Sequence, residues 1–169
     1  FRPFMAVADL LYAGPWVAER LVAVGKFFYD RPEALHPVTR AIIASAEKFG
    51  AADAFAAQYQ LRTLARLSEA VWQQVDLLAL PTTGTIYTLQ EIAADPINVN
   101  TTLGYYTNFV NLLGLSALAL PAGFTNVGLP VGLTLVTRGF AELMLLAIGN
   151  RFQHHIGASL GATGNPLPT

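Results

Sequence analysis

The sequence predicts an α/β fold in which amphipathic helices come first and an incomplete, apolar sheet follows. Charge is distributed unevenly, because residues 1–76 hold sixteen of the twenty-one charged side chains and residues 77–169 hold five. Apolar side chains recur at helical spacing in the first region and form short continuous runs in the second. Hydrophobic residues make up 53% of the chain and charged residues 12%, about half the share of roughly 25% usual in soluble domains. Part of the surface is therefore expected to be covered by another chain or by a segment outside this sequence.

Two helices are predicted near the start of the chain, over residues 4–12 and 16–29. Gly14-Pro15 separates them, and proline is tolerated in a first helical turn but kinks a helix interior. Either two helices meet at this point or one helix bends. His36-Pro37 predicts a further helix over residues 38–48, because proline is favoured at the first helical position.

The longest predicted helix covers residues 51–74. Its apolar side chains recur broadly at helical spacing and are expected to face the core, at Phe55, Tyr59, Leu64, Leu67, Val71 and Trp72. A polar stripe lies on the opposite side, at Gln58, Arg62, Arg66, Glu69 and Gln73. The apolar and polar stripes together predict an amphipathic helix with one solvent-exposed face.

The second region is predicted to contain three strands and a closing helix, over residues 76–81, 116–120, 130–137 and 141–155. Asp95-Pro96 breaks the chain before a mostly polar and aromatic stretch that ends at Asn111. The strands are nearly continuous apolar runs, as in strands covered on both faces. We therefore expect Phe124 and residues 130–136 to belong to the core.

The predicted strands make sense only as part of a larger sheet, because three of them alone would leave long edges and uncovered faces. The chain begins with Phe1 rather than methionine and ends in a Gly/Pro-rich segment. We expect an excised piece of a longer protein, in which residues 1–157 are domain and residues 158–169 are a flexible linker or tail.

Several classes of function are disfavoured by composition. The net charge is −1 and no basic cluster is present, so we expect no nucleic-acid partner. The absence of cysteine excludes disulfides and thiolate sites and suits a reducing, cytoplasmic location. No basic-then-apolar leader is present. The most apolar run, residues 112–120, is followed by proline and glycine within a few residues, which is typical of two strands joined by a turn, so no membrane span is expected.

Two patterns that could carry catalysis are better explained by structure. Residues 157–161 match G-x-S-x-G around Ser159, but a nucleophile elbow needs a preceding strand and a downstream acid and histidine. Here a helix is predicted before it and no such residues follow. His154 and His155 are adjacent, so on a helix they point about 100° apart and cannot hold one metal ion together. We expect no metal and no cofactor.

Two segments of the second region resemble amidase-signature hydrolases. They are NLLGLSALALPAGF at residues 111–124 and GLPVGLTLV at residues 128–136, with a final helix beginning near GFAE at residues 139–142. Within that family, LYAGPWVAER at residues 11–20 resembles the allophanate hydrolases, as do PTTGTIY at residues 81–87 and residues 98–111.

The resemblance implies part of a large mixed sheet flanked by helices, incomplete in this chain. It also implies a Ser–cis-Ser–Lys triad, in which the lysine activates the attacking serine through the second serine. That motif is absent here, and neither Lys26 nor Lys48 sits beside a paired serine motif. The catalytic residues are expected in the missing N-terminal half of the amidase domain, an obligatory partner, and the family commonly forms homodimers.

Substrate binding is the role that the resemblance implies for this chain, through Tyr12 and Arg20. Allophanate is a small planar molecule with a carboxylate beside a urea group, and a guanidinium fork suits that carboxylate. If helical turns continued from Tyr12 to Arg20, the side chains of residues 12, 16 and 20 would each be rotated by about 40° from the one before around the helix axis. The three side chains would then lie along one face. The alternative is that Tyr12 packs in a helix junction and Arg20 pairs with a nearby carboxylate.

The motif that contains Tyr106, Thr107 and Asn111 resembles a family segment bordering the active-site cleft. A buried asparagine that caps a turn explains Asn111 equally well. The expected reaction is hydrolysis of allophanate to ammonia and carbon dioxide. The alternatives are another amidase-signature amidohydrolase with a different substrate, or a non-catalytic interaction module with the same fold.

Overall fold

A computed structural model describes residues 1–160 and 163–167, with only the backbone at Tyr12. The α-helices are α1 Arg2–Ala13, α2 Val17–Val24, α3 Lys26–Asp30, α4 Pro37–Ala44, α5 Ala51–Glu69, α6 Leu89–Ala94, α7 Pro96–Leu103 and α8 Glu142–His155. The strands are β1 Leu78–Pro81, β2 Ser116–Phe124 and β3 Pro130–Thr137. Short 3₁₀ helices lie at η1 Pro32–Ala34, η2 Ser45–Lys48 and η3 Val71–Gln73.

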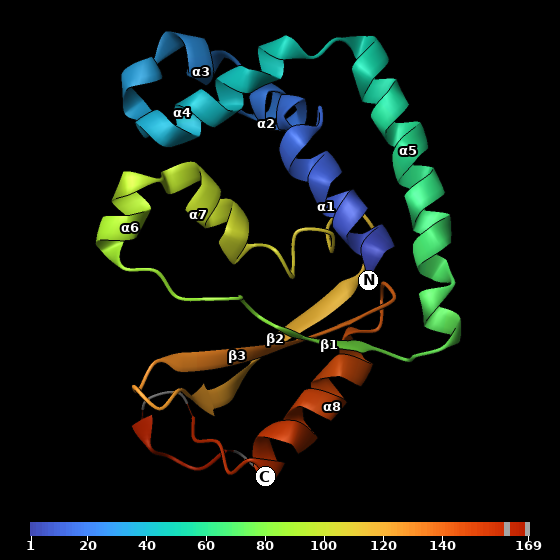
Figure 1. Cartoon of the computed structure of the whole chain (residues 1–169), viewed down its shortest axis with the longest axis vertical. Helices are drawn as coiled ribbons and strands as arrows, with labels where there is room; N and C mark the ends of the chain where they lie inside the picture. The colour runs from blue at the N-terminus through green and yellow to red at the C-terminus, as the bar shows by residue number, and fades with distance from the viewer. Residues whose placement is uncertain (161–162, 168–169) are drawn as a thin grey trace.

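The elements are arranged along a long axis (Figure 1). Helices α2, α3 and α4 gather at one end, and the sheet with α8 lies at the other. Helix α5 runs along one side between the two ends, and α1 lies beside it and contacts it. The helical end and the sheet end are therefore connected mainly through the paired helices α1 and α5.

The sheet has the order β1-β3-β2, and both of its ladders are antiparallel. Strands β2 and β3 form a hairpin in which Ser116 lies opposite Thr137 and Leu120 lies opposite Leu133. The pairing shifts register between Pro121 and Gly123, near the turn. Helices flank part of a sheet, as predicted, but no parallel ladder of a mixed sheet occurs among the described strands.

Helix α8 covers one face of this sheet. Leu145 is buried against Leu120 and Leu135, with half-buried side chains around them. Gly149 allows the helix to approach closely, since a Cβ there would lie 2.7 Å from the Cδ2 atom of Leu118 and 3.2 Å from the side chain of Leu120. The close contact of α8 with β2 therefore depends on glycine at this position.

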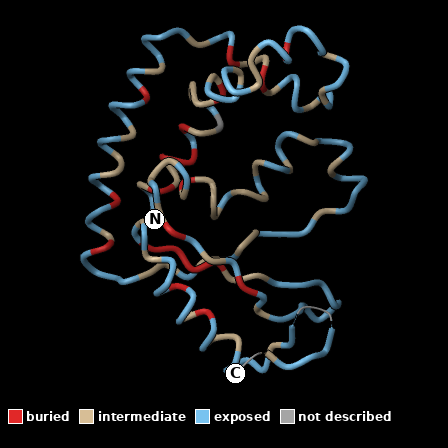
Figure 2. Tube along the Cα trace, turned by 180° about the vertical axis from the view of Figure 1, so that it is seen from behind, coloured by how far each residue is buried: buried red, intermediate tan, exposed pale blue. Residues whose placement is uncertain are grey.

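An aromatic core covers the opposite face, and Figure 2 shows its buried segments where the N-terminus meets the sheet. Phe4 and Phe109 are fully buried, with ring centroids 5.0 Å apart. The ring of Trp72 lies 5.7 Å from that of Phe4, and Val136 of β3 joins the cluster. The second half of β3 is thus covered on both faces, as its apolar sequence predicted.

Three expectations about burial were wrong. Phe124 is 76% exposed, because it lies beyond the part of β2 that α8 covers. Residues 130 and 131, at the start of β3, are also exposed. On α5 the predicted core residues Phe55, Tyr59 and Leu67 are 58%, 62% and 56% exposed. Small residues, including Ala57 and Ser68, instead face inward and let α1 approach.

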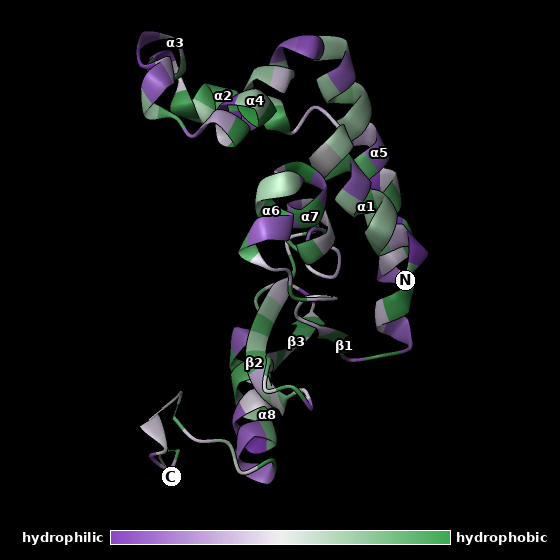
Figure 3. Ribbon diagram, turned by 60° about the vertical axis from the view of Figure 1, so that its left-hand side comes forward, coloured by the Kyte–Doolittle hydropathy of each residue, from purple (hydrophilic) through white to green (hydrophobic). Residues whose placement is uncertain are grey.

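The polar stretch before Asn111 is more helical than its composition suggested. Helix α6 begins with a capping box, in which the Thr88 hydroxyl accepts from the Glu91 N–H and the Glu91 carboxylate accepts from the Thr88 N–H. The Thr88 N–H and, with a smaller effect, the Thr88 hydroxyl donate to the Glu91 carboxylate, and both hydrogen bonds lower the pKa of Glu91. Asp95 caps α7, whose first residue is Pro96. Figure 3 shows α6 and α7 between the helical end and the sheet.

Candidate functional site

The chain turns sharply between α1 and α2, and this turn positions the candidate site. Helix α1 ends at Ala13, and Gly14 adopts an extended conformation with φ −97° and ψ −177°. A Cβ at Gly14 would collide with the carbonyl oxygen of Leu10, so the turn needs glycine. Pro15 then opens a new turn, in which its carbonyl accepts from the Ala18 N–H at 2.9 Å. Two helices meet here, so the predicted stripe through residues 12, 16 and 20 does not form.

A cavity of about 500 Å³ lies beside this turn and contains Arg20 in its lining. Its walls come from three separate parts of the chain. They are Leu11, Trp16, Glu19 and Arg20 from the first two helices and their junction, Leu61 from α5, and Asn111 and Leu112 from the segment before β2. The fold therefore brings together Arg20 and Asn111, which are distant in the sequence.

The polar side chains of this cavity are exposed to solvent. Arg20, Glu19 and Asn111 are exposed. Within the described residues, Arg138–Glu69 is the only ion pair, so Arg20 does not pair with a neighbouring carboxylate there. Asn111 is not buried, so the alternative of a buried capping asparagine is wrong. The cavity offers a guanidinium, a carboxylate and an amide around apolar walls, an arrangement suited to a small polar molecule.

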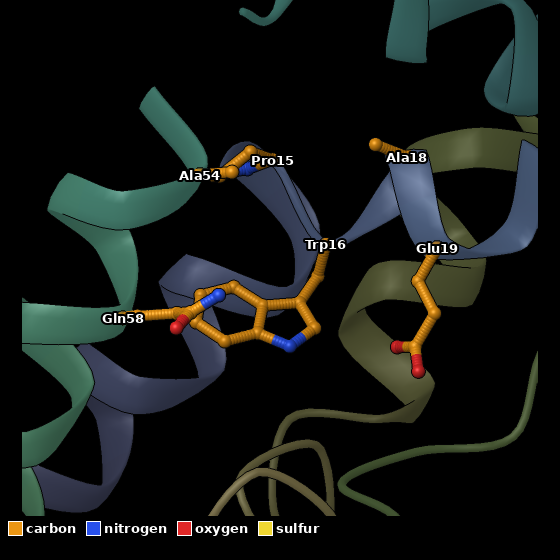
Figure 4. Close-up of a pocket in the computed structure, with 6 residues that line it drawn as sticks. All are labelled: Pro15, Trp16, Ala18, Glu19, Ala54 and Gln58. Atoms are coloured by element: carbon orange, nitrogen blue, oxygen red, sulfur yellow. The ribbon is translucent and has the colours of Figure 1, made fainter. Parts of the chain in front are cut away.

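A second cavity, of about 260 Å³, adjoins the first. Trp16 and Glu19 line both cavities, while Pro15, Ala18, Ala54 and Gln58 line only this one. Figure 4 shows the side chains of Trp16 and Glu19 extending to the same side of the chain, with Gln58 of α5 beside the indole. Trp16 and Glu19 therefore separate the two spaces, and neither residue was predicted to belong to a site.

The remaining predicted site residues have different positions. Tyr12 belongs to α1 by its backbone, and its side chain lies outside the described residues. Tyr106 is half-buried, and its ring lies 6.4 Å from that of Phe1 and 5.0 Å from that of Tyr105. The Thr107 hydroxyl donates to the Gly104 carbonyl at 3.3 Å. Tyr106 and Thr107 line neither cavity.

Ser159 lies away from this site, at the opposite end of the molecule. It borders a third cavity of about 420 Å³ with His154, and the described lining contains no carboxylate. Helix α8 precedes it, and Ser159 forms an isolated bridge with Pro166. Gly161, the last position of the G-x-S-x-G match, lies outside the described residues. In the described part of the chain, Ser159 is therefore not preceded by the strand that a nucleophile elbow requires.

Neither a metal cluster nor a membrane helix is found in residues 1–160 and 163–167. No three His, Asp or Glu side chains in this part lie close enough together to hold a metal ion. None of its helices combines the length and apolar character needed to cross a bilayer.

Comparison with known proteins identifies the family. The sequence model described as Amidase matches residues 25–146. The chain belongs to this amidase family. The predicted resemblance and fold class are confirmed by that match and by the structural neighbours described below.

Two relatives match the amidase chain over almost its whole length. The urea amidolyase of Lachancea kluyveri is 42% identical over 154 residues, which cover 90% of this chain and 8% of that protein. The allophanate hydrolase of Kluyveromyces lactis superposes with a TM-score of 0.92 at 36% identity, covering 100% of this chain and 28% of that one. The chain therefore spans a small part of the length of these relatives.

A third relative matches a shorter part of the chain. The fatty acid amide hydrolase of Medicago truncatula is 34% identical over 128 residues, which cover 72% of this chain and 21% of that protein. The Amidase match begins at residue 25, after the turn that carries Trp16, Glu19 and Arg20. This turn therefore lies outside the general family match, whereas Leu61 and Asn111 of the same cavity lie inside it.

Proposed function

We propose that this chain is part of the amidase domain of an allophanate hydrolase and that it supplies substrate-binding residues. The observation that carries the proposal is the position of Arg20, which is exposed, lines a cavity and has no ion-pair partner among the described residues. The chain also matches a urea amidolyase and an allophanate hydrolase over at least 90% of its length. The reaction is hydrolysis of allophanate to ammonia and carbon dioxide.

In this proposal Arg20 binds the carboxylate of allophanate. A guanidinium can donate two parallel hydrogen bonds to the two oxygens of a carboxylate, which orients as well as binds the molecule. Tyr12 is the second proposed substrate contact, on the strength of its motif. Asn111 lines the same cavity as Arg20 and offers an amide that can donate to or accept from the urea group.

The chemical step belongs to residues outside this chain. A serine nucleophile, assisted by a second serine and a lysine, would attack the amide carbonyl, and backbone N–H groups would stabilise the oxyanion. We propose that residues 1–157 complete the amidase domain that carries these groups, with residues 158–169 as a linker. A cytoplasmic location and a homodimer are also part of the proposal, and no cofactor is needed.

The test compares allophanate with a neutral amide in the complete enzyme. Arg20→Ala should lower kcat/KM for allophanate by about tenfold to a hundredfold, because hydrogen bonds to charged groups contribute roughly 1.5–3 kcal/mol. A slowly hydrolysed neutral amide has no carboxylate to lose, so its turnover should change little. Arg20→Lys should restore only part of the loss, since an ammonium cannot reproduce the fork.

Circular dichroism and melting must show that each variant is folded before the rates are compared. Equal losses on both substrates in a well-folded Arg20→Ala enzyme would contradict the carboxylate contact and favour a different amidohydrolase substrate. No ammonia release from allophanate by the unaltered enzyme would contradict the proposed reaction itself.

A further inference from the structure

We propose that Glu19 is a specificity determinant of this site, selecting a ligand that carries N–H donors at the end opposite its carboxylate. The inference rests on the proposed function and extends it from one end of the substrate to the other. Arg20 recognises a carboxylate, but many small acids share that group. A second contact is needed to distinguish an amide acid such as allophanate from a dicarboxylate of the same length.

The position of Glu19 is suited to this role. Glu19 and Arg20 are consecutive in α2 and both line the 500 Å³ cavity. Successive helical side chains point about 100° apart, so a ligand between them meets a cation on one side and an anion on another. Figure 4 shows the Glu19 carboxylate extending past the backbone on the same side as Trp16.

The charge of Glu19 is also not neutralised by an ion pair within the described part of the chain. It is exposed, and it forms no ion pair with the described residues, where Arg138–Glu69 is the only one. An ionised carboxylate accepts hydrogen bonds and cannot donate them. Glu19 can therefore satisfy an N–H group of a ligand, whereas a ligand carboxylate at that place would meet like charge.

Allophanate meets both requirements of this cavity. Its carboxylate suits Arg20, and its terminal amide presents two N–H donors to Glu19. Trp16 lines the same cavity and offers a flat apolar surface for the planar urea group. Malonate has a carboxylate where allophanate has the terminal amide, so it would place a second negative charge against Glu19.

The experiment measures malonate binding to the complete enzyme by titration calorimetry. Glu19→Gln removes the charge and keeps the size of the side chain. It should tighten malonate binding by about tenfold, or 1.4 kcal/mol, because it removes a contact between like charges in a solvent-exposed site. The same variant should lower kcat/KM for allophanate about fivefold, since the hydrogen bond to a charged acceptor becomes a neutral one.

Two further variants test whether the gain in malonate affinity arises from the charge of Glu19 in this cavity. Glu33 lies in η1, is exposed and borders neither cavity, so Glu33→Gln should leave the malonate Kd unchanged. Adding Arg20→Ala to Glu19→Gln should abolish the gain, because the other carboxylate loses its partner. A gain in affinity cannot result from misfolding. An unchanged malonate Kd in Glu19→Gln would overturn the inference, as would an equal gain in Glu33→Gln.

The two proposals fail in different ways. If the unaltered enzyme does not hydrolyse allophanate, the proposed reaction is wrong, and the malonate titration still decides whether Glu19 rejects a second carboxylate. If allophanate is hydrolysed and Glu19→Gln binds malonate no better, the reaction stands and Glu19 is not the selecting residue.

Discussion

Arg20 and Arg138 are both exposed arginines, but they have opposite surroundings. Arg138 follows β3, and its Nε atom donates to Glu69 at 3.1 Å while a terminal nitrogen donates to the Trp72 carbonyl at 3.0 Å. Arg20 lies beside a cavity with no ion-pair partner among the described residues. Arg138 joins the end of β3 to the end of α5, whereas Arg20 has no ion pair with the described residues.

The same contrast extends to the other polar groups of the two regions. At the sheet, Thr137 donates to the Asp76 carbonyl at 2.7 Å, and the hydroxyls of Thr82 and Thr134 lie 2.8 Å apart. At the cavity, neither Glu19 nor Arg20 forms an ion pair with the described residues. Polar groups that are hydrogen-bonded within the protein stabilise the fold. Polar groups that line a concave surface without such partners are available to bind a ligand. The polar groups of the sheet end thus contribute to the structure, and the cavity beside α2 is the region that we propose to bind the substrate.

The largest expected effect tests the core that supports both regions. Phe4 is fully buried and contacts Phe109 and Trp72. Phe4→Ala should destabilise the complete enzyme by about 3–5 kcal/mol, as large-to-small core substitutions do. Denaturant unfolding measures the change. Val22, in α2, is 80% exposed, so Val22→Ala should change stability by less than about 0.5 kcal/mol. Similar midpoints for the two variants would contradict this description of the core.

A smaller effect is expected for Arg138, and it tests the contrast with Arg20 directly. Arg138→Ala removes an exposed ion pair and a hydrogen bond to a carbonyl, so it should lower stability by about 1 kcal/mol. Its kcat/KM for allophanate should stay near that of the unaltered enzyme. Arg20→Ala should behave in the opposite way, with its melting temperature retained. A large loss of activity in Arg138→Ala without a loss of stability would break the comparison.

Much of the fold was predictable because long apolar runs and helical spacing dominate the sequence. The hairpin of β2 and β3 and the closing helix α8 follow from such signals. The buried face of α5 could not be predicted from such signals, because Phe55 and Tyr59 belong to an apolar stripe that α1 does not cover. Helices α6 and α7 were missed although a capping box at Thr88 and an Asp-Pro start were present, because that segment has few apolar side chains.

The candidate site was only partly predictable. Arg20 was assigned by its motif, but the helical stripe used to relate it to Tyr12 ends at Gly14. Its position beside Asn111 and Leu61 depends on how distant segments pack, which spacing along the chain does not reveal. Trp16 and Glu19 stood within the same motif, and only the cavity geometry distinguishes them from their neighbours.

The smallest expected effect concerns the joint between β2 and α8, and it depends on pH. The buried hydroxyl of Ser116 donates to the Glu142 carboxylate at 2.7 Å and accepts from the Ala141 N–H at 3.2 Å. The hydrogen bond from Ser116, with a smaller contribution from the backbone, lowers the pKa of Glu142 below its ordinary value. A lowered pKa in the folded state stabilises the protein above the unfolded pKa, roughly 4.3 for glutamate. This stabilisation is lost as the pH falls through the lower, folded value.

Ser116→Ala should therefore lower the melting temperature most above about pH 5, and the difference from the unaltered enzyme should shrink in more acidic solution. Part of the difference should persist at every pH, because the Ala141 N–H also loses its acceptor. Glu91, whose pKa is lowered by Thr88, titrates in both proteins and cancels from the comparison. Glu142→Gln removes the titrating group, so its difference from Glu142→Gln/Ser116→Ala should be independent of pH. A Ser116→Ala difference that stays constant between pH 7 and pH 3.5 would show that the sheet region does not depend on the charge of Glu142.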